Sequence, residues 1–438
     1  MVDKYRKIAF LGCLALFFLP FFTVHAEYDG NPVVLVPGML ASFDKKLMLH
    51  DIEDNKWGFI WRGNVYKALI KELENYGYEE GKTLFIAYYD WRKPVDETYK
   101  KYLMPKIDEA RAKSGKRQVD IVAHSMGGLL ARAYIQSNNY QDDVNKIVMM
   151  GTPNKGSTEA YVVWEGGIYP NSWNVFYKWG FDVLHWNLKR TRKLPNIQPP
   201  LSFREFFPSL RDVLPTTNFV KRDGTLLSLS EMAEKNNFLI DLNSSAHLIK
   251  SRVKEARIYA GLSGKTMDEI IIGGICTVDD NTYNRWRDGH PNPDPPTADS
   301  DEGDETVLLT SAKLLDIENY TYDGTSHIKI PDDARASVSE FFNPPVLAYL
   351  PQPFRRVVQN FVTVPTVRAD ESDLYVAPDS MLSFTVSPNV DFEVTDPDGK
   401  ILSRTENQLG EDNANFDDDP SDPDDIILVT IRNPKVGK

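Results

Sequence analysis

The feature that most constrains the fold is an alternation of short apolar runs and amphipathic segments between residues 32 and 153. The apolar runs lie at 32–38, 83–91, 119–125 and 144–153, and the amphipathic segments at 64–78, 96–115 and 127–137. Apolar runs rich in β-branched residues, separated by helical segments, are typical of βαβ units whose parallel strands are buried on both faces. The alternation therefore predicts an α/β fold with a mostly parallel sheet and flanking helices.

The alternation stops between residues 157 and 250, and four of the eight tryptophans fall between Trp164 and Trp186. An insertion of this length, with aromatic residues at irregular spacing, predicts a cap or lid over a site. An ordinary helical subdomain with tryptophans in its core is an equally good interpretation. The alternation resumes at 256–262, and a helix-like segment at 331–342 closes the unit. We expect this α/β domain to span residues 27–360.

Beyond residue 366 the sequence consists of short alternating runs separated by Pro, Asp and Gly turns, a pattern that predicts a small β-sandwich-like module over 366–438. This module holds 17 Asp or Glu against 6 Lys or Arg. Its run "DDDPSDPDD" at 417–425 is either a calcium site between loop carboxylates or a solvated acidic turn, and we favour the turn. The chain stops at "NPKVGK", where a turn would lead into another strand, so we expect the module to be truncated or one strand short.

Residues 1–26 are typical of a secretory signal peptide. Three basic residues precede the apolar run 8–22, and small residues at 24–26 supply a cleavage site after Ala26. The alternative is an uncleaved anchor, for which the apolar run is short. We therefore expect an exported protein, whether secreted, periplasmic or attached to the cell surface, with no integral membrane span after cleavage.

Charge and cysteine content exclude several classes of function. The formal net charge of −13 argues against nucleic-acid binding and against simple electrostatic docking on anionic membranes. Cys276 is the one cysteine that remains after cleavage, so no internal disulfide is expected. Its apolar surroundings, "IIGGICTV", indicate a buried small side chain rather than a nucleophile.

The stretch "VDIVAHSMGG" at 119–128 carries the main chemical signal. Ser125 follows an apolar strand and precedes a helix, with the small residues Ala123 and Gly127 two positions away on either side. A serine at such a sharp turn projects its hydroxyl from the edge of the sheet, and small neighbours keep the tight backbone free of clashes. The pattern predicts a nucleophile elbow in which Ala123 replaces the usual first glycine.

A serine nucleophile needs a histidine base, which in this fold follows the serine and the acid in the chain. The histidines after Ser125 are His185, His247, His290 and His327. His327 follows a β-like run and precedes the last helix, where a base at the carboxyl edge of the sheet is expected, although a solvated loop residue is the alternative. His124 is an unsuitable base because adjacent residues at an elbow point in different directions.

The acid and the oxyanion hole follow from the same chain order. Four carboxylates precede an apolar segment at 305–312 that we expect to be a strand, and spacing alone does not choose among them: Asp301, Glu302, Asp304 and Glu305. The oxyanion hole should be formed by the backbone N–H groups of Met126, after the serine, and of Met39, after the first strand. Their side chains are then available to line an acyl pocket.

Seven motifs together resemble the lecithin:cholesterol acyltransferase-like family, an α/β-hydrolase group of lipid acyl hydrolases and acyltransferases. They are "PVVLVPGM", "YDW" followed by Arg92, "AHSMGG", "GTPNKGS", "REFFPSLRDVLP", "GDETV" and "SH" at 326–327, in the family's order over residues 31–345. The resemblance implies Ser125 as nucleophile, Asp304 as acid and His327 as base. It also implies oxyanion positions at Met39 and Met126 and a mobile lid. Two features depart from the animal members, which staple the lid with a disulfide and have no acidic C-terminal module.

Tyr89, Asp90, Trp91 and Arg92 lie at the carboxyl end of a predicted strand. We interpret them as structural, and a role in substrate binding is the alternative. An ion pair between Asp90 and Arg92, or across loops, would brace the site. The turn "GTPNKGS" similarly fixes the edge of the site where the insertion departs.

The expected function is that of an exported serine-dependent lipid acyl hydrolase or O-acyltransferase. It would act through an acyl-enzyme on Ser125, at the surface of lipid aggregates and without a cofactor. One alternative is an esterase or amidase with a non-lipid or protein-linked substrate. Another is a non-catalytic binding protein that retains the α/β-hydrolase fold and makes its contacts through the C-terminal module.

Overall fold

The computed structural model describes residues 30–59, 65–170, 175–274, 277–291 and 297–342, together with strands between 375 and 432. The predicted signal peptide, Cys276 and most of the acidic run at 417–425 lie outside the described residues. The chain divides into two compact units, Met1–Phe342 and Asn343–Lys438, each of which is described by itself. The expected domain boundary at 360–366 also lies outside the described residues and stays a prediction.

The first unit contains a parallel sheet in the order β13-β9-β6-β5-β1-β4. Its strands are β1 (Val33–Val36), β4 (Leu84–Ile86), β5 (Val119–His124), β6 (Val144–Met150), β9 (Glu255–Leu262) and β13 (Glu318–Asp323). Every neighbouring pair in this order is parallel. The central strands β1 and β5 are buried along their whole length, as their mostly apolar sequences predict, and Asp120 and His124 of β5 are buried with them. This is the α/β-hydrolase fold, and the predicted fold class is confirmed.

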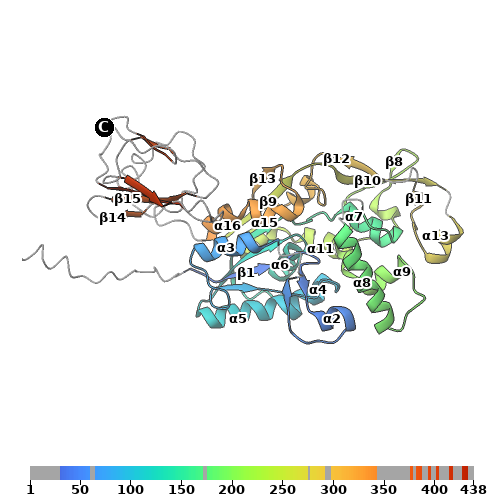
Figure 1. The fold of residues 1–438 in the computed structure, drawn as a ribbon. Helices are drawn as coiled ribbons and strands as arrows, with labels where there is room; N and C mark the ends of the chain where they lie inside the picture. The colour runs from blue at the N-terminus through green and yellow to red at the C-terminus, as the bar shows by residue number, and fades with distance from the viewer. Residues whose placement is uncertain are drawn as a thin grey trace, which may run out of the picture. The chain divides into compact units, whose positions relative to one another are not determined.

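Helices cover both faces of the sheet (Figure 1). On one side lie α3 (Lys67–Asn75), α15 (Ile330–Asp333) and α16 (Arg335–Phe342), whose apolar residues pack with Val33, Leu35 and Val122. On the other side lie α5 (Met104–Ser114) and α6 (Met126–Gln136), packed with Val34, Ile121 and Ile147. The odd and even residues of each strand thus enter two separate cores, which fixes the register of the sheet.

The amphipathic segment expected at 96–115 contains three successive parts in the structure. They are α4 (Val95–Thr98), a π-helical turn η1 (Tyr99–Leu103) and α5. A short excursion follows β1: the helix α2 (Lys45–His50) lies in the chain between two two-residue strands, β2 (Ser42–Phe43) and β3 (Gly58–Phe59), which pair with each other.

The cap is built from two stretches of chain rather than one. Residues 157–252 contribute α7 (Thr158–Tyr161), a π-helical turn η2 (Val162–Gly166), α8 (Val175–Thr191), α9 (Leu201–Phe206), α10 (Ser209–Asp212), β7 (Val220–Arg222), β8 (Thr225–Leu226), η3 (Leu229–Glu231), α11 (Asn237–Ser244) and α12 (His247–Arg252). A later stretch contributes β10 (Thr266–Gly274), α13 (Val278–Tyr283), β11 (His290–Pro291) and β12 (Thr297–Ser300). The two stretches meet in one sheet, because β10 pairs with β7, β11 and β12.

The described tryptophans of the cap are partly core and partly surface. Trp164 is 5% exposed and belongs to the main apolar core, whereas Trp186 on α8 is 61% exposed. Phe181, Phe203 and Phe207 pack against one another and against Trp91 of the α/β domain. The interpretation as core therefore fits Trp164 but not Trp186, and a lid stays a prediction.

Two further differences concern the end of the first unit. The expected strand at 305–312 is not formed: the chain bends after Asp304 and continues as α14 (Leu309–Ala312). His327 begins a single 3₁₀ turn, η4 (His327–Lys329), directly before α15.

The second unit is all-β in its described segments. Strands β14 (Tyr375–Ala377), β15 (Met381–Val386), β19 (Ile427–Arg432) and β18 (Ala414–Asp417) form an antiparallel sheet, and β16 (Glu393–Thr395) pairs with β17 (Ile401–Ser403). Two antiparallel sheets are consistent with the predicted sandwich-like module.

Candidate active site

Ser125 lies between β5 and α6 in a backbone conformation that few residues other than glycine adopt, with φ 54° and ψ −129°. The turn is tight because α6 begins at once and crosses the end of β1. A Cβ atom on Gly127 would lie 2.4 Å from the carbonyl oxygens of Val36 and Pro37. These close approaches explain why glycine follows the serine, and they give Ser125 the geometry of a nucleophile elbow.

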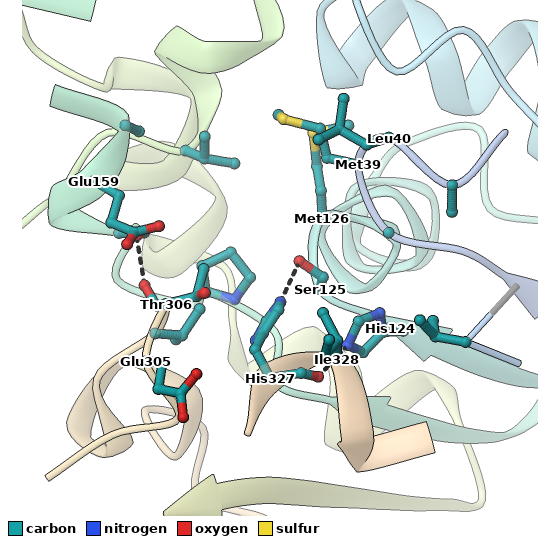
Figure 2. A pocket seen from close by; sticks show the side chains of 18 of the residues that line it. Met39, Leu40, His124, Ser125, Met126, Glu159, Glu305, Thr306, His327 and Ile328 are labelled. Carbon is teal, nitrogen blue, oxygen red and sulfur yellow. Dashed lines mark hydrogen bonds between the residues drawn. The ribbon is translucent and has the colours of Figure 1, made fainter. Parts of the chain in front are cut away.

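The structure brings Ser125, His327 and Asp304 together from three distant parts of the chain. The Nε2 atom of His327 lies 2.9 Å from the Ser125 Oγ (Figure 2), and its Nδ1 lies 2.8 Å from the Asp304 Oδ2. The carboxylate accepts, so Nδ1 carries a proton, and in the neutral ring Nε2 is free to accept from the serine hydroxyl. This is the arrangement of nucleophile, base and orienting acid.

Asp304 is held by the backbone around it. Its Oδ1 accepts hydrogen bonds from the N–H groups of Val307 at 2.7 Å and Thr306 at 3.1 Å, and its own carbonyl accepts from the N–H of His327. The side chain is 1% exposed. Of the four carboxylates that the sequence left open, Asp304 is the one bonded to His327, whereas Asp301, Glu302 and Glu305 are exposed.

The surroundings of His327 raise the pKa of its imidazole ring. Burial by itself would lower its pKa, but the charge and hydrogen bond of Asp304 outweigh burial and raise the pKa above the usual 6.5. The carboxylate of Glu159 raises it further. The protonated form of His327 is therefore favoured.

The other histidines have different surroundings. His185 packs against Phe203 and Phe206 on the cap, and His290 pairs with Asp280 at 2.6 Å. His247 begins α12. Among the described residues that line the cavity at Ser125, the histidines are His124 and His327.

His124 connects the loop of Gly38 and Met39, through Tyr66, to the backbone of His327. Its Nε2 lies 3.0 Å from the His327 carbonyl oxygen and its Nδ1 lies 2.9 Å from the hydroxyl of Tyr66, which in turn accepts from the N–H of Gly38 at 2.7 Å. Burial lowers the pKa of His124 to about 3, so the ring is neutral. Because a carbonyl can only accept, Nε2 carries the proton and Nδ1 accepts from Tyr66. Tyr66 lies in a predicted helix, and no sequence motif marks it.

Ser125 opens on a cavity of about 210 Å³. Met39 and Met126, the two expected oxyanion positions, both line it and lie with Leu40 on one side of Ser125, as Figure 2 shows. Across the cavity from these residues lie Glu159, Thr306 and Glu305 (Figure 2). The cavity thus has an apolar wall and a polar wall, with the Ser125 hydroxyl between them.

The apolar wall is extended by the cap. Ala160 and Val163 from α7 and η2, and Leu210 and Val213 from α10 and its end, line the same cavity. The cap is fixed to the site by hydrogen bonds: the Ser157 hydroxyl donates to the carbonyl of Thr306 at 2.6 Å, and the Ser157 N–H donates to the carbonyl of Val213. The chain after "GTPNKGS" therefore joins the cap to the loop that carries the acid.

The "YDWR" residues are buried beside the site rather than in it. Arg92 is fully buried and donates to both carboxylate oxygens of Asp90, to Asp51, and to the carbonyls of Leu47 and Met48. The arginine thereby ties α2 to the end of β4. The structural interpretation of this motif agrees with these contacts.

Glu159 is the cavity residue that the sequence reasoning missed. It is 5% exposed and follows the "GTPNKGS" turn by two residues. The interpretation of that turn as an edge of the site was the available signal, because the first residues after a site-edge turn are well placed to face the site.

Comparison with known proteins agrees with the sequence motifs. Residues 57–172 match the family model described as "Lecithin:cholesterol acyltransferase". Lecithin-cholesterol acyltransferase-like 4 of Arabidopsis thaliana is 30% identical over 28% of this chain and 25% of its own length. Phospholipase A(1) LCAT3 of the same plant is 33% identical over 30% of each chain. The predicted resemblance to this family is confirmed, and the matches span about a quarter to a third of these relatives.

Among solved structures, the mature lipase BlEst2 of Bacillus licheniformis is 16% identical, with a TM-score of 0.35, over 71% of this chain and 91% of that one. Across the described residues, no helix is both long and apolar enough to cross a membrane.

Proposed function

We propose that the protein is an exported serine-dependent lipid acyl hydrolase or O-acyltransferase that works through an acyl-enzyme on Ser125. The observation that carries the proposal is the hydrogen-bonded series Ser125, His327 and Asp304 at the edge of a cavity with an apolar wall. The resemblance to a family of lecithin:cholesterol acyltransferases supports a lipid ester as the substrate.

In the first half-reaction, His327 Nε2 takes the proton of the Ser125 hydroxyl while the oxygen attacks the ester carbonyl. The backbone N–H groups of Met126 and Met39 donate to the oxyanion that develops. His327 then gives its proton to the leaving alcohol oxygen, and the acyl group remains on Ser125. Asp304 keeps the imidazole in the required tautomer and stabilises its charged form.

In the second half-reaction, water or an alcohol takes the place of the leaving group. His327 accepts the proton of this acceptor, and Ser125 leaves with its hydroxyl restored. The chemistry of both steps uses protein groups alone, so the proposal includes no cofactor. A calcium site at 417–425 would lie outside the catalytic unit and is not part of the mechanism.

The apolar wall supports an acyl chain as the group bound on the oxyanion side. Met39, Leu40 and Met126 line the cavity together with Val163 and Leu210 of the cap, and methionine side chains adapt to flexible chains. Contact with a lipid aggregate is supported by Trp186 on α8, which is 61% exposed and lies beneath the guanidinium of Arg190. Export is supported by the basic and apolar segments of residues 1–26.

The test uses the mature chain, residues 27–438, and its Ser125→Ala variant with a monoacylglycerol emulsion and a long-chain alcohol. We expect free fatty acid or alkyl ester from the wild type, with a loss on the order of 10⁴-fold or more in the variant. Mass spectrometry of the products gives the ratio of hydrolysis to acyl transfer.

The alternative functions have their own outcomes in this experiment. Serine-dependent turnover of short soluble esters without turnover of long-chain lipids would favour a non-lipid esterase or amidase. Equal product from wild type and Ser125→Ala, on lipids and short esters alike, would contradict the catalytic proposal and favour a binding protein.

A further inference from the structure

The two walls of the cavity receive different parts of an ester. Because His327 must protonate the leaving oxygen, the alcohol portion has to lie beside Nε2 of His327. The acyl portion leaves the carbonyl carbon in another direction, and the apolar side chains of Met39, Leu40 and Met126 offer it a surface in the same cavity. Figure 2 shows the polar wall with Glu159, Thr306 and Glu305 on the His327 side, away from the two methionines. The alcohol portion of the substrate therefore meets the polar wall.

The polar wall is acidic. Glu159 and Glu305 both line the cavity, and none of the described residues that line it is a lysine or an arginine. The remaining polar groups there are hydroxyls, from Ser157, Thr306 and Ser326. Carboxylates accept hydrogen bonds from hydroxyl groups and repel phosphate, and the repulsion is strong where water is excluded.

Of the two carboxylates, Glu159 should interact more strongly with a bound alcohol or phosphate, because it is the more buried. It is 5% exposed, whereas Glu305 lies at an exposed position on the rim. Its position is fixed by the Ser157 hydrogen bonds to the carbonyls of Thr306 and Val213, which hold the start of α7 against the loop of the acid. Figure 2 shows its carboxylate directed toward Thr306, across the cavity from Ser125. Its charge also reaches His327, whose pKa it raises.

We propose that Glu159 makes the alcohol side of the cavity selective for uncharged, hydroxyl-bearing leaving and acceptor alcohols, such as glycerol with a free neighbouring hydroxyl, and against alcohols that carry a phosphate. The carboxylate accepts a hydrogen bond from the second hydroxyl of the alcohol and repels an anionic group in the same place. This inference rests on the proposed function and specifies its substrate class.

The experiment compares two substrates that differ only in this charge: a 1-acylglycerol and the corresponding 1-acylglycerol 3-phosphate, both in the same neutral detergent micelles. The proteins are the mature wild type, Glu159→Gln and Glu302→Gln. Glu302 is exposed and does not line the cavity, so its variant removes an equal charge nearby without changing the wall. The readout is the ratio of kcat/KM for the neutral and the anionic substrate, measured at low and high salt.

We expect the wild type to prefer the neutral substrate by about tenfold or more, as a like charge within the cavity predicts. Glu159→Gln should lose most of this preference, mainly through faster turnover of the phosphate substrate, whereas Glu302→Gln should keep it. A preference that persists in Glu159→Gln, or equal turnover of both substrates by the wild type, would overturn the inference.

A third substrate separates this inference from the proposed function. p-Nitrophenyl butyrate has a leaving group without a hydroxyl neighbour or a phosphate. Serine-dependent turnover of this ester, with no discrimination between the two lipids, would overturn the selectivity alone. No difference between wild type and Ser125→Ala on any of the three substrates would overturn both.

Discussion

At the scale of single residues, the site depends on a serine held in an unfavourable backbone conformation. A non-glycine residue at φ 54° and ψ −129° costs about 1–3 kcal/mol and persists only where its surroundings fix it. Here the N–H of Ser125 donates to the carbonyl of Met150 on β6, and its carbonyl accepts from the N–H of Gly128. The sheet and the helix thus hold the serine from both sides.

The raised pKa of His327 predicts how activity depends on pH. The base must be neutral, so kcat/KM should fall as the pH decreases through the folded pKa, which lies above 6.5. Asp304→Asn removes the main cause of the raised pKa. We expect kcat to fall about 10⁴-fold and the acidic limb of the pH–rate profile to move to lower pH. An unchanged limb in this variant would contradict the assignment of Asp304 as the partner of His327.

The raised pKa of His327 also makes the stability of the folded protein depend on pH. Because its folded pKa is raised, His327 contributes stability below pH 6.5 that is lost as the pH rises through the folded pKa. His124, with its pKa lowered to about 3, acts in the opposite sense. As the pH falls, this histidine binds a proton in the unfolded chain before it does so in the folded protein. Stability is therefore lost as the pH falls from 6.5 toward 3.

We predict that the hydroxyl of Tyr66 holds in place the loop of Gly38 and Met39, which carries one of the two proposed oxyanion donors. Tyr66→Phe leaves the Gly38 N–H and the His124 Nδ1 without their shared partner, at a cost of about 1–3 kcal/mol. We expect a lower urea midpoint and a kcat reduced about tenfold, with a smaller change in KM, because Met39 follows Gly38 directly. Tyr88 packs against the same Phe59 ring, and Tyr88→Phe serves as the matched control. Equal kinetics in the two variants would argue against this role.

At the scale of elements, the crossing of α6 over the end of β1 positions the nucleophile. Gly128 makes a second close approach, since a Cβ there would meet the side chain of Thr152. Two consecutive glycines allow the first turn of α6 to lie directly against the strands on both sides. A side chain at either of these two positions would require the strand end or Thr152 to move.

Gly127→Ala tests this crossing. The added Cβ would lie 2.4 Å from two backbone oxygens, which cannot move as a flexible side chain would. We expect a loss of about 1–3 kcal/mol or more in the free energy of unfolding, and a large loss of activity because Ser125 and Met126 shift with the helix. Gly58→Ala has open space around the new Cβ and should change neither property. Wild-type stability in Gly127→Ala would show that α6 is free to move.

At the scale of the whole molecule, Ser125, Asp304 and His327 all belong to the first of the two compact units. A chain of residues 27–360 should therefore fold and hydrolyse soluble p-nitrophenyl esters at a rate within about twofold of the mature chain. Circular dichroism and steady-state kinetics measure the two properties. Failure of this shorter chain to fold would mean that the second unit is part of the catalytic fold.

The cap sheet illustrates what the sequence leaves undetermined. The strand β10 follows β9 closely, and its apolar residues would suit the central sheet equally well. It instead pairs with β7, about fifty residues earlier in the chain, which enlarges the expected insertion by a second stretch. Pairing between strands depends on the partners that packing makes available, and a local pattern carries no information about them.

The sequence by itself determined the features that depend on local chemistry. The parallel sheet follows from apolar runs buried on both faces, and the elbow follows from small residues around Ser125, because backbone sterics act over a few positions. Spacing left four carboxylates open and the family resemblance implied Asp304, which the tertiary structure places beside His327. The tertiary structure also made 305–312 a bend and a helix, and joined Tyr66 to His124 and Glu159 to the cavity. These outcomes depend on contacts between residues far apart in the chain, where distance and burial, rather than local pattern, determine the partner.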